Sequence, residues 1–247
     1  MRLYSELLAS LRDTEPSFMP EIRNKLATKA KAVELGMDVP ALYGVFETPD
    51  DLDLRLLPKC FALKRHMQPA MVLLMRDGVD QNGVTWTTET LQQRFAAIQR
   101  RETSSFVPKL FAEEYIHPPQ GLSPREHRFF VIGNVVRFVL VDFDRFEGRK
   151  QLVYTPTWKR TAYWSRTKCA QPDHPGLPRP KAFSAMKDFA ERFSELWPSP
   201  TVTVDVLVAD ERPVFGEAGV FHLGCKPIHP EWDEMMGKMW LESCGEP

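Results

Sequence analysis

Apolar residues recur at helical spacing in four stretches of the chain. In residues 1–18 one face carries Leu3, Leu7, Leu8 and Leu11 with acidic residues between them, which predicts an amphipathic helix. The same spacing predicts helices within residues 85–102, capped by Thr87 or Thr88, and within residues 181–198. A shorter helix is expected over residues 28–35, with Thr28 as its N-cap and Gly36 just past its end.

Runs of β-branched and alternating apolar residues predict the strands. We expect strands over residues 41–46, 60–64 and 109–116, and hairpins over residues 126–145 and 201–219. The dipeptide Gly133-Asn134 suits a two-residue turn in the first hairpin. Residues 155–180 are rich in Pro, Lys, Arg and aromatic residues and are expected to be mostly loop. The mixture of helices and mainly antiparallel strands predicts the α+β class.

The second hairpin carries a carboxylate in each of its arms. If its turn is centred on Glu211, then Asp205 lies opposite Glu217 on the neighbouring strand. Like charges placed directly opposite each other are destabilising, unless a cation lies between them. Hard divalent cations prefer oxygen ligands, so the pair is a candidate metal and nucleotide site. The alternative is a register that differs by one residue, or one acid that faces solvent.

Composition narrows the choice of function. The chain has 247 residues, 43% of them hydrophobic and 26% charged, with a net charge of −1, which is typical of a soluble globular protein of one or two domains. There is no overall basic field that would attract nucleic acid or a membrane surface, and no stretch is long enough to span a membrane. The four cysteines form no CxxC pair, so neither a zinc ribbon nor a disulfide framework is indicated, and a cytoplasmic location is expected.

The order of charged elements resembles the ATP-grasp superfamily, and in particular its teichuronopeptide-biosynthesis (TupA-like) branch. The resemblance covers roughly residues 25–235 and is carried by "TKAKAVELG", "LYGVFETPDDLDLRLLPKCFALK", "FAEEYI", "REHRFFVIGNVVRFVLVDFDR" and "VTVDVLVADERPVFGEAG". It implies an ATP-grasp fold: two α+β subdomains with the nucleotide between antiparallel sheets, and a reduced N-terminal region. The implied bounds are 1–27 for an N-terminal helix and lead-in, 28–112 for the small subdomain and 113–247 for the large subdomain.

The resemblance also implies a set of site residues for ATP and Mg²⁺. The nucleotide would be bound by Lys29, Lys64, Glu113, Glu114, Tyr115, Ile116 and Glu126. The catalytic basic residues would be Arg128 and Arg145, and the metal ligands Asp205 and Glu217. Two alternatives remain open from the residues alone: the lysines are solvated surface charges, and "FAEEYI" is an edge strand with exposed glutamates.

The chain departs from the family pattern at two places. After Lys64 the family usually has a Gly-rich loop, whereas this chain has "RHMQPA", in which Pro69 has no N–H to donate, so that Arg65, His66 or Gln68 would have to serve instead. The last position of the usual Glu-x-Asn metal motif is Gly219, which removes one ligand. A zinc site from His222, Cys225 and His229 is not favoured, because no fourth ligand follows at a familiar spacing.

The resemblance implies a ligase that activates a carboxylate as an acylphosphate and passes it to an amine. Its substrates would be small-molecule carboxylates and amines, carried on an amino acid, a peptide or a saccharide, in cell-surface polysaccharide or natural-product biosynthesis. The alternatives are an ATP-grasp phosphotransferase, and a catalytically inactive protein that uses the fold for binding or as a scaffold. No nucleic-acid partner is expected, and the sequence does not indicate an oligomeric state.

Overall fold

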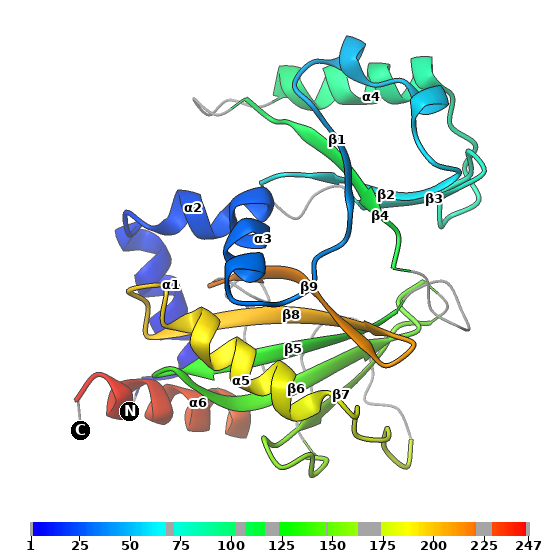
Figure 1. The fold of residues 1–247 in the computed structure, drawn as a ribbon. Helices are drawn as coiled ribbons and strands as arrows, with labels where there is room; N and C mark the ends of the chain where they lie inside the picture. Colours follow the sequence, from blue (N-terminus) through cyan, green and yellow to red (C-terminus); the bar gives the residue numbers. More distant parts are fainter. Residues whose placement is uncertain are drawn as a thin grey trace. The chain divides into compact units, whose positions relative to one another are not determined.

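The computed structural model describes residues 2–67, 72–101, 107–116, 124–146, 148–162, 174–220 and 229–245 (Figure 1). The chain forms two compact units. The large unit comprises Met1–Ile22, Ala27–Val39 and His117–Pro247, and the small unit comprises Arg23–Leu26 and Pro40–Ile116. These units are defined by packing alone, so the subdomain boundaries expected from the family resemblance stay a prediction.

The small unit is built on a four-stranded antiparallel sheet. Its strands are β1 (Leu42–Phe46), β2 (Cys60–Arg65), β3 (Val72–Arg76) and β4 (Leu110–Glu114), in the order β1-β4-β2-β3. Two short 3₁₀ helices, Pro49–Asp51 and Leu54–Leu56, connect β1 to β2. The apolar face packs against α4 (Thr88–Arg101), whose Leu91 and Phe95 are fully buried, as its helical spacing predicts. Because β4 lies between β1 and β2, the alternative of an edge strand for "FAEEYI" is wrong.

The large unit is built on a five-stranded antiparallel sheet. Its strands are β5 (Arg125–Ile132), β6 (Val135–Phe143), β7 (Lys150–Tyr154), β8 (Thr201–Ala209) and β9 (Arg212–Gly219), in the order β7-β6-β5-β8-β9. The two expected hairpins are confirmed. Each turns through two residues with positive φ, Gly133 and Asn134 in one and Asp210 and Glu211 in the other. This left-handed backbone matches the twist of the flanking strands.

Helices cover both faces of this sheet, as Figure 1 shows. On one face α5 (Phe183–Ser194) buries Met186, Phe189 and Phe193, which are the positions expected from its apolar spacing. On the opposite face α6 (Pro230–Ser243) places the Trp232 ring edge-on to the rings of Phe130 and Phe138. The α6 helix therefore covers one end of this second face, and the polar side chains of the site lie toward the other end.

The N-terminal helix α1 (Tyr4–Thr14) packs against α6. Asp233 of α6 accepts hydrogen bonds from the Ser5 backbone N–H and hydroxyl, both at 2.7 Å. Gly237 of α6 leaves no room for a side chain, because a Cβ there would lie 2.3 Å from the carbonyl oxygen of Arg2. The first and last described helices are thus in close backbone contact.

A short helix α2 (Met19–Arg23) leads into α3 (Lys25–Glu34). The expected N-cap at Thr28 is wrong, because α3 begins three residues earlier, where the Asn24 side chain accepts a hydrogen bond from the Leu26 N–H at 3.1 Å. The end of the helix is as expected: Gly36 follows it with a φ of +82°, a conformation that glycine adopts readily.

Several expectations fall outside the described residues. These concern Gln68 and Pro69 of the loop after β2, residues His222 and Cys225 of the zinc site that the sequence does not favour, and residues 163–173 of the long loop. Within the described ranges, Cys60 and Cys244 are exposed free thiols. No helix in the described part of the chain is both long and apolar enough to cross a membrane.

Candidate functional site

The β8–β9 hairpin brings Asp205 directly opposite Glu217. This pairing confirms the predicted one, although the turn does not have the predicted centre. A turn centred on Glu211 would place Val206 opposite Gly216, whereas the structure pairs Val206 with Phe215. The register shifts between these two pairs, so β9 has one residue in excess, Gly216. This β-bulge restores the alignment of the two acids.

Gly216 suits this bulge for a steric reason. A Cβ at this position would lie 3.1 Å from the Asp205 carbonyl oxygen, closer than a side chain comfortably approaches. The Gly216 carbonyl oxygen accepts a hydrogen bond from Lys29 Nζ at 3.1 Å. Lys29 is only 6% exposed, and its ammonium lies 5.9 Å from the centroid of the Phe215 ring. Lys29, expected from the resemblance to contact phosphate, is therefore held against the bulge.

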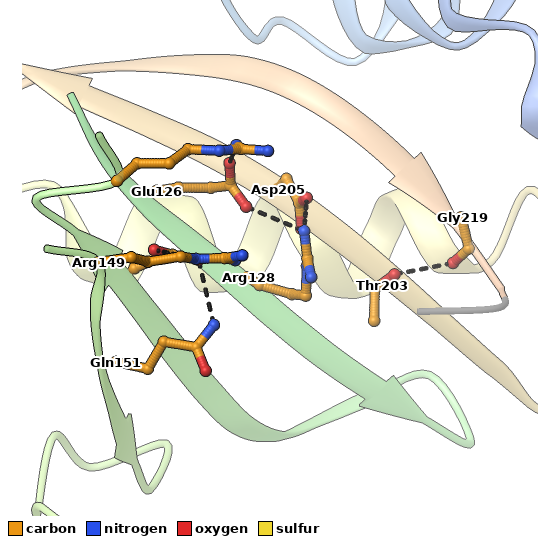
Figure 2. A network of polar contacts seen from close by, with 9 residues as sticks. Glu126, Arg128, Arg149, Gln151, Thr203, Asp205 and Gly219 are labelled. Atoms are coloured by element: carbon orange, nitrogen blue, oxygen red, sulfur yellow. Dashed lines mark hydrogen bonds and ion pairs between the residues drawn. The ribbon is translucent and has the colours of Figure 1, made fainter. Parts of the chain in front are cut away.

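Arg128 of β5 binds Asp205 through two parallel hydrogen bonds, shown in Figure 2. Its Nε donates to Oδ1 at 2.7 Å and its Nη2 donates to Oδ2 at 2.5 Å. The same Nη2 donates to Glu126 Oε1 at 2.9 Å, and Arg145 Nη1 donates to Glu126 Oε2 at 2.9 Å. Four of the residues expected from the resemblance, on three different segments, thus form one network within the large unit.

The electrostatic setting of Asp205 is unusual for a carboxylate. Burial, together with the nearby carboxylates Glu126 and Glu217, raises the pKa of Asp205 to about 7 despite the opposing charge of Arg128. Burial lowers the pKa of the Arg128 guanidinium, but Asp205, Glu126 and Glu217 outweigh burial and raise it well above its usual range. Three carboxylates therefore gather around one guanidinium.

The paired acids fit a Mg²⁺ ion that also binds nucleotide. Asp205 and Glu217 supply hard oxygen ligands from adjacent strands, and each carboxylate oxygen can accept more than one contact. Among the described residues no group of three or more His, Cys, Asp or Glu side chains is placed to hold a metal. Two protein ligands cannot form a complete cage, so the remaining ligands would have to be phosphate oxygens and water, which is the usual arrangement for Mg²⁺.

The strand positions beside the two acids carry small neutral residues. Thr203 lies opposite Gly219, and its hydroxyl donates to the Gly219 carbonyl oxygen at 3.0 Å (Figure 2). Among the described residues, a Cβ added at Gly219 would meet no atom within 4 Å. The space for a third ligand is therefore present, although the side chain is not.

A second ionic cluster on β6 and β7 was not expected from the sequence. The Asp142 carboxylate accepts from Arg149 Nε at 2.9 Å and 2.7 Å and also from Arg149 Nη2, and Gln151 Nε2 donates to its Oδ2 at 3.1 Å. Asp142 lies directly opposite Glu126 of the first network. The signal in the sequence was a charged residue inside the apolar run "VVRFVLVDF", followed by a polar residue in "KQLVY".

In the small unit, Lys64 of β2 forms an ion pair with Glu113 of β4. Lys64 Nζ lies 2.6 Å from Glu113 Oε1, and the two side chains are 16% and 1% exposed. Lys64 is not a solvated surface lysine, and Glu113 is not an exposed strand residue, so both alternatives are wrong for these two positions. Glu113 is buried and Lys64 is mostly buried, on the two central strands of the sheet.

The other residues expected to line a base pocket are also anchored within the small unit. The Glu114 carboxylate accepts from the Ala41 N–H at 3.2 Å, and its own N–H donates to the Ala41 carbonyl oxygen at 2.7 Å. The Tyr115 hydroxyl accepts from Arg76 Nη2 at 3.2 Å, and Ile116 is buried. The segment after β4 is therefore fixed by backbone and side-chain contacts.

Comparison with known proteins agrees with this arrangement. The model of the TupA-like ATP-grasp family matches residues 25–241 of the chain. A search of curated protein sequences gives no match.

Solved structures with the same fold include several ligases. D-alanine–D-alanine ligase from Bacillus anthracis, complexed with ATP, superposes with a TM-score of 0.55 and 10% identity, covering 96% of this chain and 72% of that one. The ATP-grasp ligase PsnB, complexed with a phosphomimetic precursor variant, Mg and ADP, gives a TM-score of 0.51 and 11% identity, covering 97% and 67%. The L-amino acid ligase from Bacillus licheniformis gives 0.52 and 16%, covering 90% and 48%. These likenesses show the fold.

Proposed function

The chain belongs to the TupA-like ATP-grasp family, and from that premise we propose that it is an ATP-dependent carboxylate–amine ligase. It would activate a carboxylate as an acylphosphate and join it to an amine as an amide. The substrates would be small carboxylates and amines, carried on an amino acid, a peptide or a saccharide. This class agrees with the amino acid, D-alanine and precursor-peptide ligases that share the fold.

One observation carries the proposal: the bulge that aligns Asp205 with Glu217. A hairpin without the bulge would place the two acids out of register, so their alignment depends on a specific departure from regular pairing. Bringing two carboxylates together costs free energy unless a cation is bound. Arg128 and Arg145 neutralise two of the three carboxylates gathered here, and a bound metal ion would neutralise the charge that is left.

Within the large unit the acidic and the basic side chains have different roles. Asp205 and Glu217 would hold Mg²⁺, which when bound neutralises charge on the phosphate groups of ATP. Arg128 and Arg145 present guanidinium groups that suit phosphoryl and carboxylate oxygens. Their contacts with Glu126 and Asp205 fix these guanidinium groups in place before any ligand arrives, so that little reorganisation is needed during the reaction.

Within the small unit, Lys64 would bind ATP phosphate, and Glu113 to Ile116 would bind the base and ribose. Because Lys64 is buried against Glu113, its ammonium is already positioned in the absence of ligand. Lys29, which is bound to Gly216, would act by supporting the bulge as well as by its charge.

The proposal is tested by measuring ADP release over a matrix of carboxylates and amines, with and without Mg²⁺. A ligase requires both substrates and forms an amide. A phosphotransferase releases ADP without an amine and leaves a stable phosphorylated product. An inactive binding protein is stabilised against heat by nucleotide but releases no ADP.

Variants of the hairpin acids sharpen this test. Asp205→Asn and Glu217→Gln keep the shape but remove charge, and each should abolish Mg²⁺-dependent turnover. Asp210→Asn is the matched control, because Asp210 is an exposed acid in the turn of the same hairpin. Equal activity in all three variants would refute the assignment of the metal ligands.

A further inference from the structure

An arginine of the edge strand β3 contacts the segment that follows β4. Arg76 Nη2 donates to the Tyr115 hydroxyl at 3.2 Å, and the Arg76 guanidinium carbon lies 5.2 Å from the centroid of the Tyr115 ring. The strand β2 lies between β3 and β4, so this contact reaches across a whole strand (Figure 1). The function proposed above gives Arg76 no role.

The strand register explains how these two side chains meet. Cys60 of β2 is paired with Arg76 of β3. The next residue of β2, Phe61, is paired with Glu114 of β4. Continuing this second register by one residue places Tyr115 level with Cys60. The two long side chains therefore flank a short one, which leaves room for them to make contact.

The contact lies on the same face of the small sheet as Lys64, the candidate phosphate ligand. Residues two apart on a strand share a face, so Cys60 and Lys64 lie on one face of β2. The opposite face packs against α4 through Phe61 and Leu63. At about 3.3 Å per residue, Lys64 lies roughly 13 Å along β2 from the level of Arg76. The arginine and the lysine thus mark the two ends of one face.

Apolar packing does not account for the position of the Tyr115 ring. Tyr115 is 7% exposed, but the hydrophobic core of the described small unit, which includes Phe61 and Leu110, does not contain it. A buried tyrosine hydroxyl usually has a hydrogen-bond partner, and a guanidinium over the ring adds a cation–π attraction. Arg76 supplies both interactions.

Arg76 is itself held by a tight turn. Its N–H donates to the Val79 carbonyl oxygen at 2.9 Å, and the Val79 N–H donates to the Arg76 carbonyl oxygen at 2.9 Å. Asp77 and Gly78, the two residues between them, have positive φ, as in the two-residue turns that match the twist of a strand pair. Within the described ranges no carboxylate forms an ion pair with Arg76, so ion pairing does not explain the residue.

Three consecutive residues at the end of β4 are each held by a different segment. The Glu113 carboxylate is held from β2, and Glu114 is held by the backbone just before β1. Tyr115, the next residue, is held by Arg76 from β3. The path of the chain at this point is therefore fixed from three separate parts of the small unit.

Resting on the nucleotide-binding function proposed above, we propose that Arg76 is a positioning residue for the nucleotide base. It acts through Tyr115, which belongs to the segment assigned to the base and ribose. A segment held in a fixed path can distinguish a 6-aminopurine from a 6-oxopurine, because the oxo compound exchanges a donor for an acceptor and leaves polar groups unpaired. Arg76 would thereby support discrimination between bases without contacting the base.

A matched pair of nucleotides tests this role. ADP has an amino group at position 6 of its purine and IDP has an oxo group, whereas the ribose and phosphates are identical. We expect the wild-type protein to bind MgADP about tenfold or more tightly than MgIDP in calorimetry. Arg76→Met should reduce this preference to about threefold or less. Arg76→Lys, which keeps a charge and a donor, should retain most of it.

A double-variant cycle shows whether Arg76 acts through Tyr115. Tyr115→Leu removes both the ring and the hydroxyl. In that background Arg76→Met should change MgADP affinity by less than about twofold, because the group through which it acts is already missing. Arg94→Met is the matched control, since Arg94 is an exposed arginine of α4, on the other face of the sheet. Its base preference should equal that of the wild type.

The outcomes separate this inference from the proposed function. If the wild type does not bind MgADP, the nucleotide-dependent function is refuted. If it binds MgADP, then equal affinity for MgIDP, or a preference that Arg76→Met leaves unchanged, overturns the role of Arg76. A purely structural role would weaken both nucleotides alike and leave their ratio unchanged.

A further variant keeps the test valid if Arg76→Met fails to fold. Tyr115→Phe removes only the hydroxyl that Arg76 binds, and it should lower the preference for MgADP over MgIDP. An unchanged preference in Tyr115→Phe would overturn the role of this contact.

Discussion

Lys29 Nζ and the backbone carbonyl of Gly216 form a hydrogen bond of 3.1 Å, which links α3 to the bulged residue of β9. The bond satisfies a carbonyl group that the bulge removes from the regular ladder. Lys29 therefore supports the alignment of two acids that lie far from it in the sequence.

We expect Lys29→Met to destabilise the protein by about 2 kcal/mol in the absence of nucleotide, because a buried acceptor loses its donor. Urea unfolding measures this loss, with Lys31→Met as the control, since Lys31 forms a partly exposed ion pair with Glu21. If Lys29 serves only to contact phosphate, the stability of the ligand-free variant will equal that of the wild type.

Gly219→Asn should strengthen Mg²⁺-dependent nucleotide binding about tenfold or more, by supplying a side-chain oxygen where the family usually has one. Mutating a residue that only hydrogen-bonds a metal ligand typically changes metal affinity by about 10-fold to 100-fold. A direct ligand should therefore contribute at least tenfold. In the part of the chain that the structure describes, no atom lies within 4 Å of a Cβ at this position, so stability should change by less than about 0.5 kcal/mol.

Gly216→Ala is the matched control for that variant. Its Cβ would lie 3.1 Å from the Asp205 carbonyl oxygen, so we expect a loss of about 1 kcal/mol or more and no gain in affinity. Calorimetric titration with MgADP distinguishes the two variants. Equal behaviour of both would contradict the idea that Gly219 marks a vacant ligand position.

Lys64→Met should cost about 3 kcal/mol of stability before any ligand is added. The variant leaves Glu113, 1% exposed, without the ammonium that lies 2.6 Å away. Adding Glu113→Gln should recover much of the stability but not the affinity for nucleotide. A stable Lys64→Met protein would show that Glu113 does not depend on this partner.

His127 should make the protein less stable as the pH falls. Burial, and then the charge of Arg125, lower the pKa of His127 to about 4, so the folded protein keeps the ring neutral while the unfolded chain binds a proton below about pH 6.5. The stability contributed by the neutral ring is complete above pH 6.5 and is lost progressively down to pH 4, by about 3 kcal/mol in all.

The variant His127→Phe should remove this loss while preserving the ring stack on Trp158, whose centroid lies 6.0 Å away. Urea midpoints between pH 7.5 and pH 4.5 measure the difference between the two proteins. Parallel curves for wild type and variant would show that His127 titrates normally.

When Mg²⁺ is absent, Asp205 should increase the stability of the folded protein as the pH falls, which is the opposite of the effect of His127. Burial raises its pKa above that of the unfolded chain, so the folded state binds the proton more readily and gains stability as the pH falls through that raised pKa. Asp205→Asn should therefore make the loss of stability on acidification steeper than in the wild type. A shallower curve in this variant would contradict the direction of the shift.

The sequence was sufficient for those features that depend on local pattern. The apolar spacing of α4 and α5 predicted their buried faces. The pairing of Asp205 with Glu217 was predicted from a turn centred on Glu211, and it holds only because a bulge offsets the error of one residue in that centre. The bulge could not be predicted in the same way, because Gly216 is stabilised by a lysine 187 positions away.

Strand β7 and helix α6 could not be predicted, because their apolar residues follow neither the helical nor the strand period clearly. The strand β7 has only five residues, and its Lys150 and Gln151 make it look like loop, although Gln151 is buried against Asp142. The helix α6 has apolar residues on more than one side, and Gly237 in its interior argues against a helix by propensity alone. Its glycine is explained only by the close approach of the Arg2 backbone.

The contact between α1 and α6 has a consequence for the order of events during protein synthesis. Ser5 emerges from the ribosome early, but Asp233, which accepts its two hydrogen bonds, follows 228 residues later. At a translation rate of about 5–20 residues per second, α1 waits for roughly 10–45 seconds before its docking partner exists. During that interval the apolar side chains of Tyr4, Leu7 and Leu8, which are buried in the folded protein, lack the surface of α6 against which α1 packs.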